Sequence, residues 1–286
     1  MDTQQLQAFI AVAENHSFSG AAEQLHLTQP AVSKRIASLE QQLGTPVFDR
    51  FGRTTALTQA GLALLPKARQ ILQDMTDAQQ IIADLQGDIK GTLSLATSHH
   101  IGLHRLPPVL RQFTRDYPDV RLDLHFLDSE QAYDEVLQGH FELAVITLSP
   151  QLDTRVDTQV VWQDRLRFVA APEHPLASKS SLTLSDLSQW PALLPDQDTY
   201  TTRLIRQEFD LQQLSLDVGM VSNHLDTLKM MISLELGWGV LPDTMIDAQV
   251  RVLPVSKPIV TRQLGCIRHR QRSPSNAARA FTRLLA

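Results

Sequence analysis

Two short amphipathic helical patterns separated by a tight polar break lie within residues 17–43, and they constrain the fold of this chain more than any other feature. The apolar residues of the first pattern recur at the spacing of one helix face, as Phe18, Ala21, Ala22 and Leu25. Those of the second pattern are Val32, Ile36, Leu39 and Leu43. Only residues 26–28 remain for the turn, so the stretch predicts a helix-turn-helix.

The second helix has an outward face suited to a DNA groove. Thr28 is placed to cap this helix through its hydroxyl, and Pro30 fits the first turn, where no N–H is needed. The face is small and polar, and its one long cation points away from the core. It could present Gln29, Ser33 and Lys34 to base edges in a major groove. An ordinary solvated helix face is the alternative interpretation.

The segments on either side extend this unit. Residues 3–14 predict a helix that packs behind the pair and completes a three-helix core. Residues 47–57 predict a β-hairpin with Gly52 near its tip, in the position of the wing of a winged helix. Arg50 and Arg53 flank the tip, where they could reach phosphates or an adjacent minor groove. A solvated loop with scattered arginines is the alternative.

Residues 58–86 predict one long helix with an apolar seam. The seam residues alternate steps of four and three, as Leu64, Ala68, Ile71, Met75, Ala78, Ile82 and Leu85. Pro66 can kink this helix without ending it. Because a small domain cannot bury so long a seam, we expect a partner helix and therefore a dimer, which matches a dyad-symmetric operator. The alternative is that the helix packs on its own C-terminal domain.

Beyond residue 91 the apolar pattern changes period, and strands alternate with helices. The predicted strands are residues 92–97, 120–127, 143–147, 165–171, 192–194, 216–222 and 262–268, with a glycine-bounded turn into a short strand at 237–242. The predicted helices are residues 103–115, 130–138, 224–234 and 276–285. This order implies an α/β fold with mostly parallel strands and helices on both faces of the sheet.

The first ninety or so residues resemble a LysR-type transcriptional regulator. The matching motifs are AA at 21–22, TQPAVS at 28–33, LE at 39–40, LG at 43–44, F-x-R at 48–50, Arg53 and LT-x-AG at 57–61. The chain departs from the family at 34–35, where Lys-Arg replaces the common Arg-Gln and moves a guanidinium by one position. The features and the resemblance together predict DNA contacts from Thr28, Gln29, Pro30, Ser33, Lys34, Arg35, Ser38, Arg50 and Arg53.

The resemblance also implies the architecture of the whole chain. Residues 1–58 would form a winged helix-turn-helix, residues 59–87 a linker and dimerisation helix, and residues 91–286 an effector-binding domain like a periplasmic binding protein. Its lobe I would hold residues 91–160 with 266–286, and its lobe II residues 161–265. His174-Pro175-Leu176 and the GWGVLP segment resemble family landmarks more weakly. Contacts between effector domains would build a homotetramer, and RNA polymerase is a further candidate partner.

A small-molecule effector is expected between the lobes, beyond the carboxyl ends of the strands. Hydroxyl and imidazole groups follow the first strand and have counterparts in later turns, at Asp128-Ser129, Thr147, Thr199-Tyr200 and Ser222-Asn223. The predicted effector-binding residues are Thr97, Ser98, His99, His100, Ser129, Thr147, Thr199, Tyr200 and Ser222. Hydroxyls facing each other across a hinge suit a small carboxylate or oxyanion. For each residue, plain helix capping is the alternative.

Composition sets further bounds. The chain has 286 residues, a net charge of −5 and a single cysteine, Cys266, which fits a reducing cytoplasm. No leader or membrane-spanning run is evident, so we expect a cytoplasmic protein without a membrane partner. Residues 1–60 carry four basic and five acidic groups, which predicts modest DNA affinity per subunit and a need for oligomerisation.

No motif for a cofactor or for catalysis is evident, so we expect neither a cofactor nor enzyme activity. His99, His100 and His104 could in principle hold a metal, but no local cysteine or carboxylate completes the shell, and none is expected. The sequence thus predicts an effector-responsive, sequence-specific transcriptional regulator. The alternatives are an effector-independent architectural DNA-binding protein and a metabolite-binding protein or enzyme whose N-terminal domain only dimerises.

Overall fold

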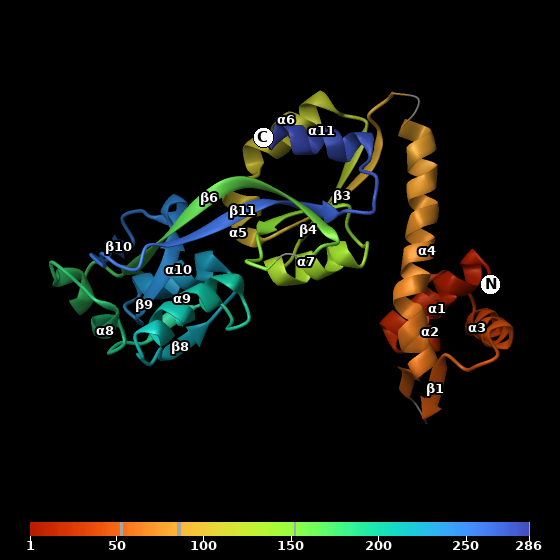
Figure 1. Ribbon diagram of the computed structural model, residues 1–286, viewed down its shortest axis with the longest axis horizontal. Coiled ribbons are helices and arrows are strands. Elements are labelled where there is room, and N and C mark those ends of the chain that lie inside the picture. Colours follow the sequence, from red (N-terminus) through yellow and green to blue (C-terminus); the bar gives the residue numbers. More distant parts are fainter. Residues whose placement is uncertain (52–53, 85–86, 152, 286) are drawn as a thin grey trace. The chain divides into compact units, whose positions relative to one another are not determined.

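A computed structural model describes residues 1–51, 54–84, 87–151 and 153–285. The chain divides into two compact units, Met1–Asp88 and Ile89–Ala286, each with its own hydrophobic core (Figure 1). Within the described ranges, no helix combines the length and the apolarity needed to cross a membrane.

The first unit begins with three helices, α1 (Thr3–Asn15), α2 (Phe18–Gln24) and α3 (Gln29–Leu43). Val32 and Ile36 are completely buried against the other two helices, as the helical spacing predicts. The predicted hydroxyl cap at Thr28 is wrong, although this residue occupies the N-cap position. Pro30 has no N–H, and the N–H of Ala31 already donates to the Thr28 carbonyl at 3.0 Å, so no donor is left for the hydroxyl.

A two-stranded antiparallel hairpin, β1 (Phe48–Phe51) and β2 (Thr54–Leu57), follows α3 and confirms the predicted wing. The Phe48 ring holds it to the helices, with centroids 5.4 Å from Phe9 and 5.8 Å from Phe18. The Glu40 carboxylate accepts a hydrogen bond from the Val47 N–H at 2.9 Å. The orientation of the hairpin is therefore set by the same core that positions α3.

Helix α4 (Gln59–Asp84) continues through Pro66 as one element. Its first half packs on its own unit, where Ala68 is completely buried and Leu64 and Leu72 are partly buried in the three-helix core. Arg69 adds an ion pair of 2.9 Å to Glu14 of α1. The expected seam therefore does not begin at Leu64, because the first residues of the row cover the domain's own core.

The second unit contains one sheet in the order β4-β3-β5-β11-β6-β9-β7-β8, with β10 paired to β6. We call the half with the parallel strands β3 (Gly91–Thr97), β4 (Val120–Phe126) and β5 (Leu143–Thr147) lobe I. The half with the parallel strands β7 (Ala192–Leu194), β8 (Val218–Val221) and β9 (Trp238–Pro242) is lobe II. In lobe I, α6 and α11 cover one face of the sheet and α7 covers the other (Figure 1).

Two long strands, β6 (Val156–Ala170) and β11 (Val260–His269), run through both lobes and pair antiparallel to each other. The prediction of mostly parallel strands therefore holds within each lobe and fails where the lobes join. The strand predicted at 165–171 begins nine residues earlier, at Val156. Its outer part, from Val156 to Arg165, pairs with β11 along one edge and mixes polar and apolar residues without the clean alternation of a half-buried strand.

The helices of this unit are α5 (His99–His104), α6 (Pro107–Asp116), α7 (Ser129–Leu137), α8 (Leu184–Leu187), α9 (Tyr200–Leu211), α10 (Leu225–Ser233) and α11 (Asn276–Leu284). Short 3₁₀ turns occupy Pro175–Ser178 and Asp243–Met245, and β10 covers Arg251–Val252. The single helix predicted at 103–115 is wrong. The chain breaks at Arg105 and Leu106, because Pro107 and Pro108 cannot donate the N–H groups that a continuous helix would need there.

Candidate functional site

The outward face of α3 is open and polar. Thr28, Gln29, Pro30 and Lys34 are exposed, and Ser33 is partly exposed. The Gln29 side chain donates to the Ser33 hydroxyl at 3.0 Å, so the two form one polar patch. Within the described part of the chain, Lys34 makes no hydrogen bond or ion pair, and its ammonium is available to a phosphate or a base edge.

Two other predicted DNA contacts hold the helices together. The Arg35 guanidinium donates to the Gln4 side chain at 3.0 Å, and the Ser38 hydroxyl accepts from the Gln5 side chain at 3.0 Å. Both bonds tie α3 to α1, because these side chains lie toward the edge of the three-helix core. The displaced guanidinium at position 35 is thus used inside the domain.

Of the two predicted wing arginines, Arg50 lies within the described residues, in β1 opposite Thr55. Arg53 and the predicted tip at Gly52 lie outside the described residues. Their predicted contacts with phosphates or a minor groove therefore stay predictions.

The second half of α4 carries an uncovered apolar row. Ile71, Met75 and Ile82 are 37%, 46% and 65% exposed, and Ala78 between them is exposed too. Leu85, the last residue of the predicted seam, lies outside the described residues. A row of apolar side chains at steps of four, three and four is the surface that a partner helix covers.

We expect Met75→Asp combined with Ile71→Asp to weaken self-association at least tenfold, because each carboxylate would be buried against an apolar partner helix. Sedimentation over a range of concentrations measures this. The control Gln79→Asp with Asp74→Glu changes exposed residues of the same helix outside the row and should leave the dimer unchanged. An unaltered dimer in the first variant would place the interface elsewhere.

A small cavity of about 50 Å³ lies between the lobes of the second unit. It is enclosed by the turns that follow β3 and β4, by the end of β5, by the turns after β7 and β8, and by β11. The carboxyl ends of parallel strands from both lobes therefore meet there, as in other open α/β sheets. Ser98 lines it, and its hydroxyl has no hydrogen-bond partner among the described residues.

Buried charges form the base of this cavity. The Arg262 guanidinium donates to Asp164 Oδ2 at 2.9 Å and to the Thr201 hydroxyl at 2.9 Å. Arg105 donates to the other oxygen of Asp164 at 2.7 Å. Burial by itself would raise the pKa of Asp164, but the neighbouring His100, Arg262 and Arg105 outweigh it and lower that pKa. Two guanidinium groups thus share one carboxylate below the cavity, and the carboxyl groups of Asp128 and Glu130 line its rim.

His100 lies beside this cluster, with Nε2 3.4 Å from Asp164 Oδ2. The imidazole is buried, and neither ring nitrogen makes a hydrogen bond within the described chain. Burial lowers the pKa of His100, with the charge of Arg262 adding to this effect. A neutral imidazole that lines the cavity, with Nε2 beside Asp164 and Nδ1 unbonded in the described chain, can contact a ligand.

The lowered pKa of His100 predicts that the stability of the folded protein depends on pH. Below its ordinary pKa of 6.5, His100 takes up a proton in the unfolded chain but not in the folded one, so stability is full above pH 6.5 and falls below it. We expect the free energy of unfolding to fall by up to about 1.4 kcal/mol for each pH unit below 6.5. In urea unfolding between pH 7 and 5, His100→Gln should remove this contribution to the pH dependence. The exposed His125→Gln is the control. Equal slopes in His100→Gln and the unmodified protein would contradict the assignment.

Two hydrogen bonds cross from one lobe to the other beside the cavity. The backbone N–H of Tyr200 donates to Glu130 Oε1 at 2.6 Å, and the Asn223 amide donates to Asp128 Oδ2 at 2.6 Å. Burial raises the pKa of Glu130. These bonds hold the turns of the two lobes against each other and leave only a small volume between them.

Comparison with known proteins decides the family. Residues 3–62 match the family model of the "Bacterial regulatory helix-turn-helix protein, lysR family", and residues 86–286 match that of the "LysR substrate binding domain". The chain belongs to the LysR family. It is therefore a transcriptional regulator with a helix-turn-helix and an effector-binding domain.

Relatives of this LysR-family regulator cover nearly its whole length. A probable nitrogen assimilation transcriptional activator of Synechococcus elongatus is 30% identical over 93% of this chain and 88% of its own length. A full-length OxyR variant from Pseudomonas aeruginosa has the same fold, with a TM-score of 0.74 and 22% identity over 100% of this chain and 94% of that one. Full-length CbnR in complex with its target DNA has a TM-score of 0.66 and 21% identity over 100% of both chains.

The structure brings six of the nine predicted effector residues of this LysR-family chain to one cavity, namely Ser98, His99, His100, Ser129, Thr147 and Thr199. Three others do not line it. The Thr97 hydroxyl is buried and donates to the Val145 carbonyl at 2.8 Å, which ties β3 to β5. Tyr200 lines a separate shallow pocket beside Arg203, and the Ser222 hydroxyl accepts from the backbone N–H of the turn in which it lies.

The cavity is also lined by Arg262, Thr201 and Glu130, which were not among the predicted effector-binding residues. Arg262 stands opposite Asp164 in the register of β11 and β6, so each charge neutralises the other across the strands. A basic residue inside a predicted strand was the available signal, but its partner depends on the register. Among the described residues, no group of three or more His, Cys, Asp or Glu side chains could hold a metal ion.

Proposed function

We propose that this regulator binds an operator of dyad symmetry as a dimer and that a small carboxylate or oxyanion between the lobes sets its activity. Contacts between effector domains would join two dimers into a tetramer. The observation that carries the proposal is the cavity based on Arg262 and Asp164, in a chain whose recognition helix leaves Lys34 free. RNA polymerase is a proposed partner at the promoter.

The DNA-binding half of the proposal rests on α3 and α4. The exposed Gln29, Ser33 and Lys34 can reach base edges if α3 enters a major groove. An uncovered apolar row on α4 would join two such helices into one dyad-symmetric unit. The likeness in fold to CbnR, which has been solved with its target DNA, supports this assignment.

The effector half rests on unused polar groups in the cavity. The Ser98 hydroxyl and the His100 ring nitrogens have no hydrogen-bond partner among the described residues, and Arg262 supplies positive charge beside them. A volume of about 50 Å³ admits a group no larger than a carboxylate or an inorganic oxyanion. A larger acid would have to separate the Tyr200–Glu130 and Asn223–Asp128 contacts.

The two inter-lobe hydrogen bonds suggest how effector binding could reach the DNA-binding units. A ligand can shift the regulator only through different affinities for two arrangements of its lobes. Binding that breaks or strengthens the two inter-lobe bonds would change the angle between paired DNA-binding units and so the bend of the promoter. We propose that the protein does this without catalysis and without a further cofactor.

Thermal unfolding of the full-length protein across a panel of carboxylates and oxyanions tests the effector site. A ligand at a hundred times its Kd should stabilise the folded protein by about 2.7 kcal/mol. Ser98→Ala should abolish this stabilisation by the ligand, and the exposed Ser256→Ala should retain it. If a ligand still stabilises Ser98→Ala, the effector binds outside this cavity. If no compound of the panel stabilises the protein, an architectural DNA-binding protein is favoured.

A further inference from the structure

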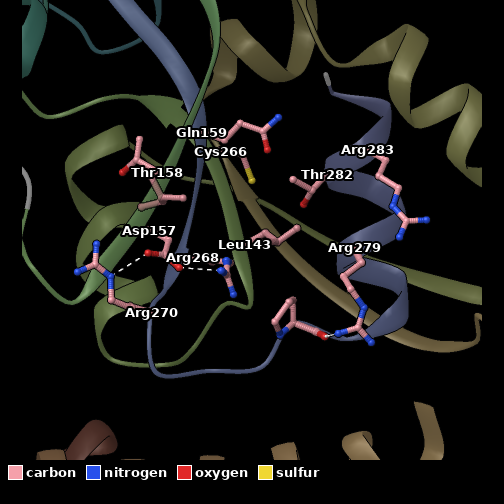
Figure 2. Close-up of a pocket in the computed structure, with 12 residues that line it drawn as sticks. Leu143, Asp157, Thr158, Gln159, Cys266, Arg268, Arg270, Arg279, Thr282 and Arg283 are labelled. Carbon is pink, nitrogen blue, oxygen red and sulfur yellow. Dashed lines mark hydrogen bonds and ion pairs between the residues drawn. The ribbon is translucent and has the colours of Figure 1, made fainter. Parts of the chain in front are cut away.

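A larger pocket lies in lobe I and shares no lining residue with the inter-lobe cavity. Its volume is about 630 Å³, within the usual size range of small-molecule sites. Figure 2 shows the Arg268, Arg270 and Asp157 side chains on the strand side and the Arg279 and Arg283 side chains on the α11 side. The pocket is therefore a hollow between the ends of β6 and β11 and the last helix.

The charge of this lining is strongly unbalanced. Four arginines, Arg268, Arg270, Arg279 and Arg283, face a single carboxylate, Asp157. Asp157 accepts from Arg268 at 2.7 Å and from Arg270 at 2.8 Å, so one negative charge serves two positive ones. The lining carries three more positive than negative charges.

The helix side of the pocket places two of these cations next to each other. Arg279 and Arg283 are four residues apart on α11 and stand on the same face of the helix. The Arg279 guanidinium donates to the Asn276 side chain at 2.6 Å, and within the described chain Arg283 has no hydrogen bond or ion pair. Like charges at this spacing repel each other, and an anion between them would relieve that repulsion.

The rest of the wall is neutral and suits the body of an organic molecule. Leu143 and Ile267 supply apolar surface, and Thr282 supplies a hydroxyl. The Thr158 hydroxyl oxygen is buried and has no hydrogen-bond partner within the described ranges. Burial raises the pKa of the Cys266 thiol to about 12, so its sulfur stays neutral and leaves the positive charge of the pocket uncompensated.

We propose that this pocket is a second small-molecule site, which binds an organic anion carrying two or more carboxylate or phosphate groups. Guanidinium groups on two facing walls can each hold one anionic group in paired hydrogen bonds. A single carboxylate would reach one wall, whereas a polyanion spans both and adds to the hydrogen bonds that Arg268, Arg270 and Arg279 already make within the chain. The enclosed volume fits a small molecule better than a segment of DNA or protein.

Calorimetric titration of the full-length protein with citrate and with inorganic pyrophosphate, at ionic strength matched by potassium chloride, tests the proposal. We expect saturable binding of at least one probe, weakened at least tenfold by Arg279→Gln with Arg283→Gln. Arg111→Gln with Arg115→Gln is the matched control, because these arginines have the same spacing on the exposed side of α6 in the same lobe. That control should bind as the unmodified protein does.

Three results would overturn the second site. They are the absence of binding by the unmodified protein, equal binding by the Arg279–Arg283 variant, and loss of binding in Ser98→Ala alone, which would assign the anion to the inter-lobe cavity. If the double variant loses DNA affinity but binds both probes normally, these arginines contact DNA. Should that variant fold poorly, Arg283→Lys keeps the charge but not the paired hydrogen bonds, and it should weaken binding by a smaller factor.

Discussion

Replacing Asp164 with asparagine is expected to lower the free energy of unfolding of the second unit by about 3–5 kcal/mol. Asp164 is 1% exposed and is the carboxylate to which both Arg262 and Arg105 donate. Without its charge, the buried Arg262 guanidinium keeps its desolvation cost but loses its counter-ion. Urea unfolding followed by the intrinsic fluorescence of the buried Trp238 in the same unit measures the change.

The control for this effect is Asp243→Asn. Asp243 also pairs with an arginine, Arg167, at 2.7 Å, but its side chain is half exposed, so the loss should stay below about 1 kcal/mol. Replacing both Asp164 and Arg262 by leucine and methionine should recover part of the stability, because no unpaired charge then remains between them. A loss below about 1 kcal/mol for Asp164→Asn would show that solvent reaches the cluster.

Removing the polar groups of the recognition helix should abolish sequence-specific DNA binding. For Ser33→Ala with Lys34→Ala, we expect operator affinity to fall by about 10²–10⁴-fold, since each base contact is worth about 1–3 kcal/mol and a dimer presents it twice. The physical reason is that Lys34 has no partner within the described chain, so its ammonium is free for the groove. Operator affinity is measured by selecting binding sites from a random duplex library and titrating the best site with each variant.

Lys179→Ala in the second unit is the control for net charge, because it also removes one lysine but from a surface ion pair with Asp186. Unchanged specific binding by the Ser33–Lys34 variant would mean that the N-terminal domain only dimerises, as in a metabolite-binding protein. Weak preference among all sequences, with affinity insensitive to any ligand, would instead indicate an architectural DNA-binding protein.

Local patterns in the sequence determined the elements of the first unit. Apolar side chains at steps of three and four can meet a core only in a helix, and the hairpin residues can pair only with each other, so α1, α2, α3 and the wing follow from short-range geometry. The same holds for β3, in which polar and apolar residues alternate, and for β5, whose continuous apolar run is typical of a strand covered on both faces. The outward position of Lys34 needed only the helical period.

Long-range pairing decided the rest, because it depends on which surfaces meet. Ala68 continues the heptad row of α4, yet it is buried by its own domain, and no local pattern distinguishes these two environments. Thr97 and Ser98 are adjacent, but the first hydroxyl bonds across to β5 and only the second lines the cavity. Arg262 and Asp164 are far apart in the chain, and the register of β6 and β11 makes them partners. Strand register is set by the packing of whole faces, so the sequence alone determined the elements of the first unit and the tertiary structure determined the charges at the site.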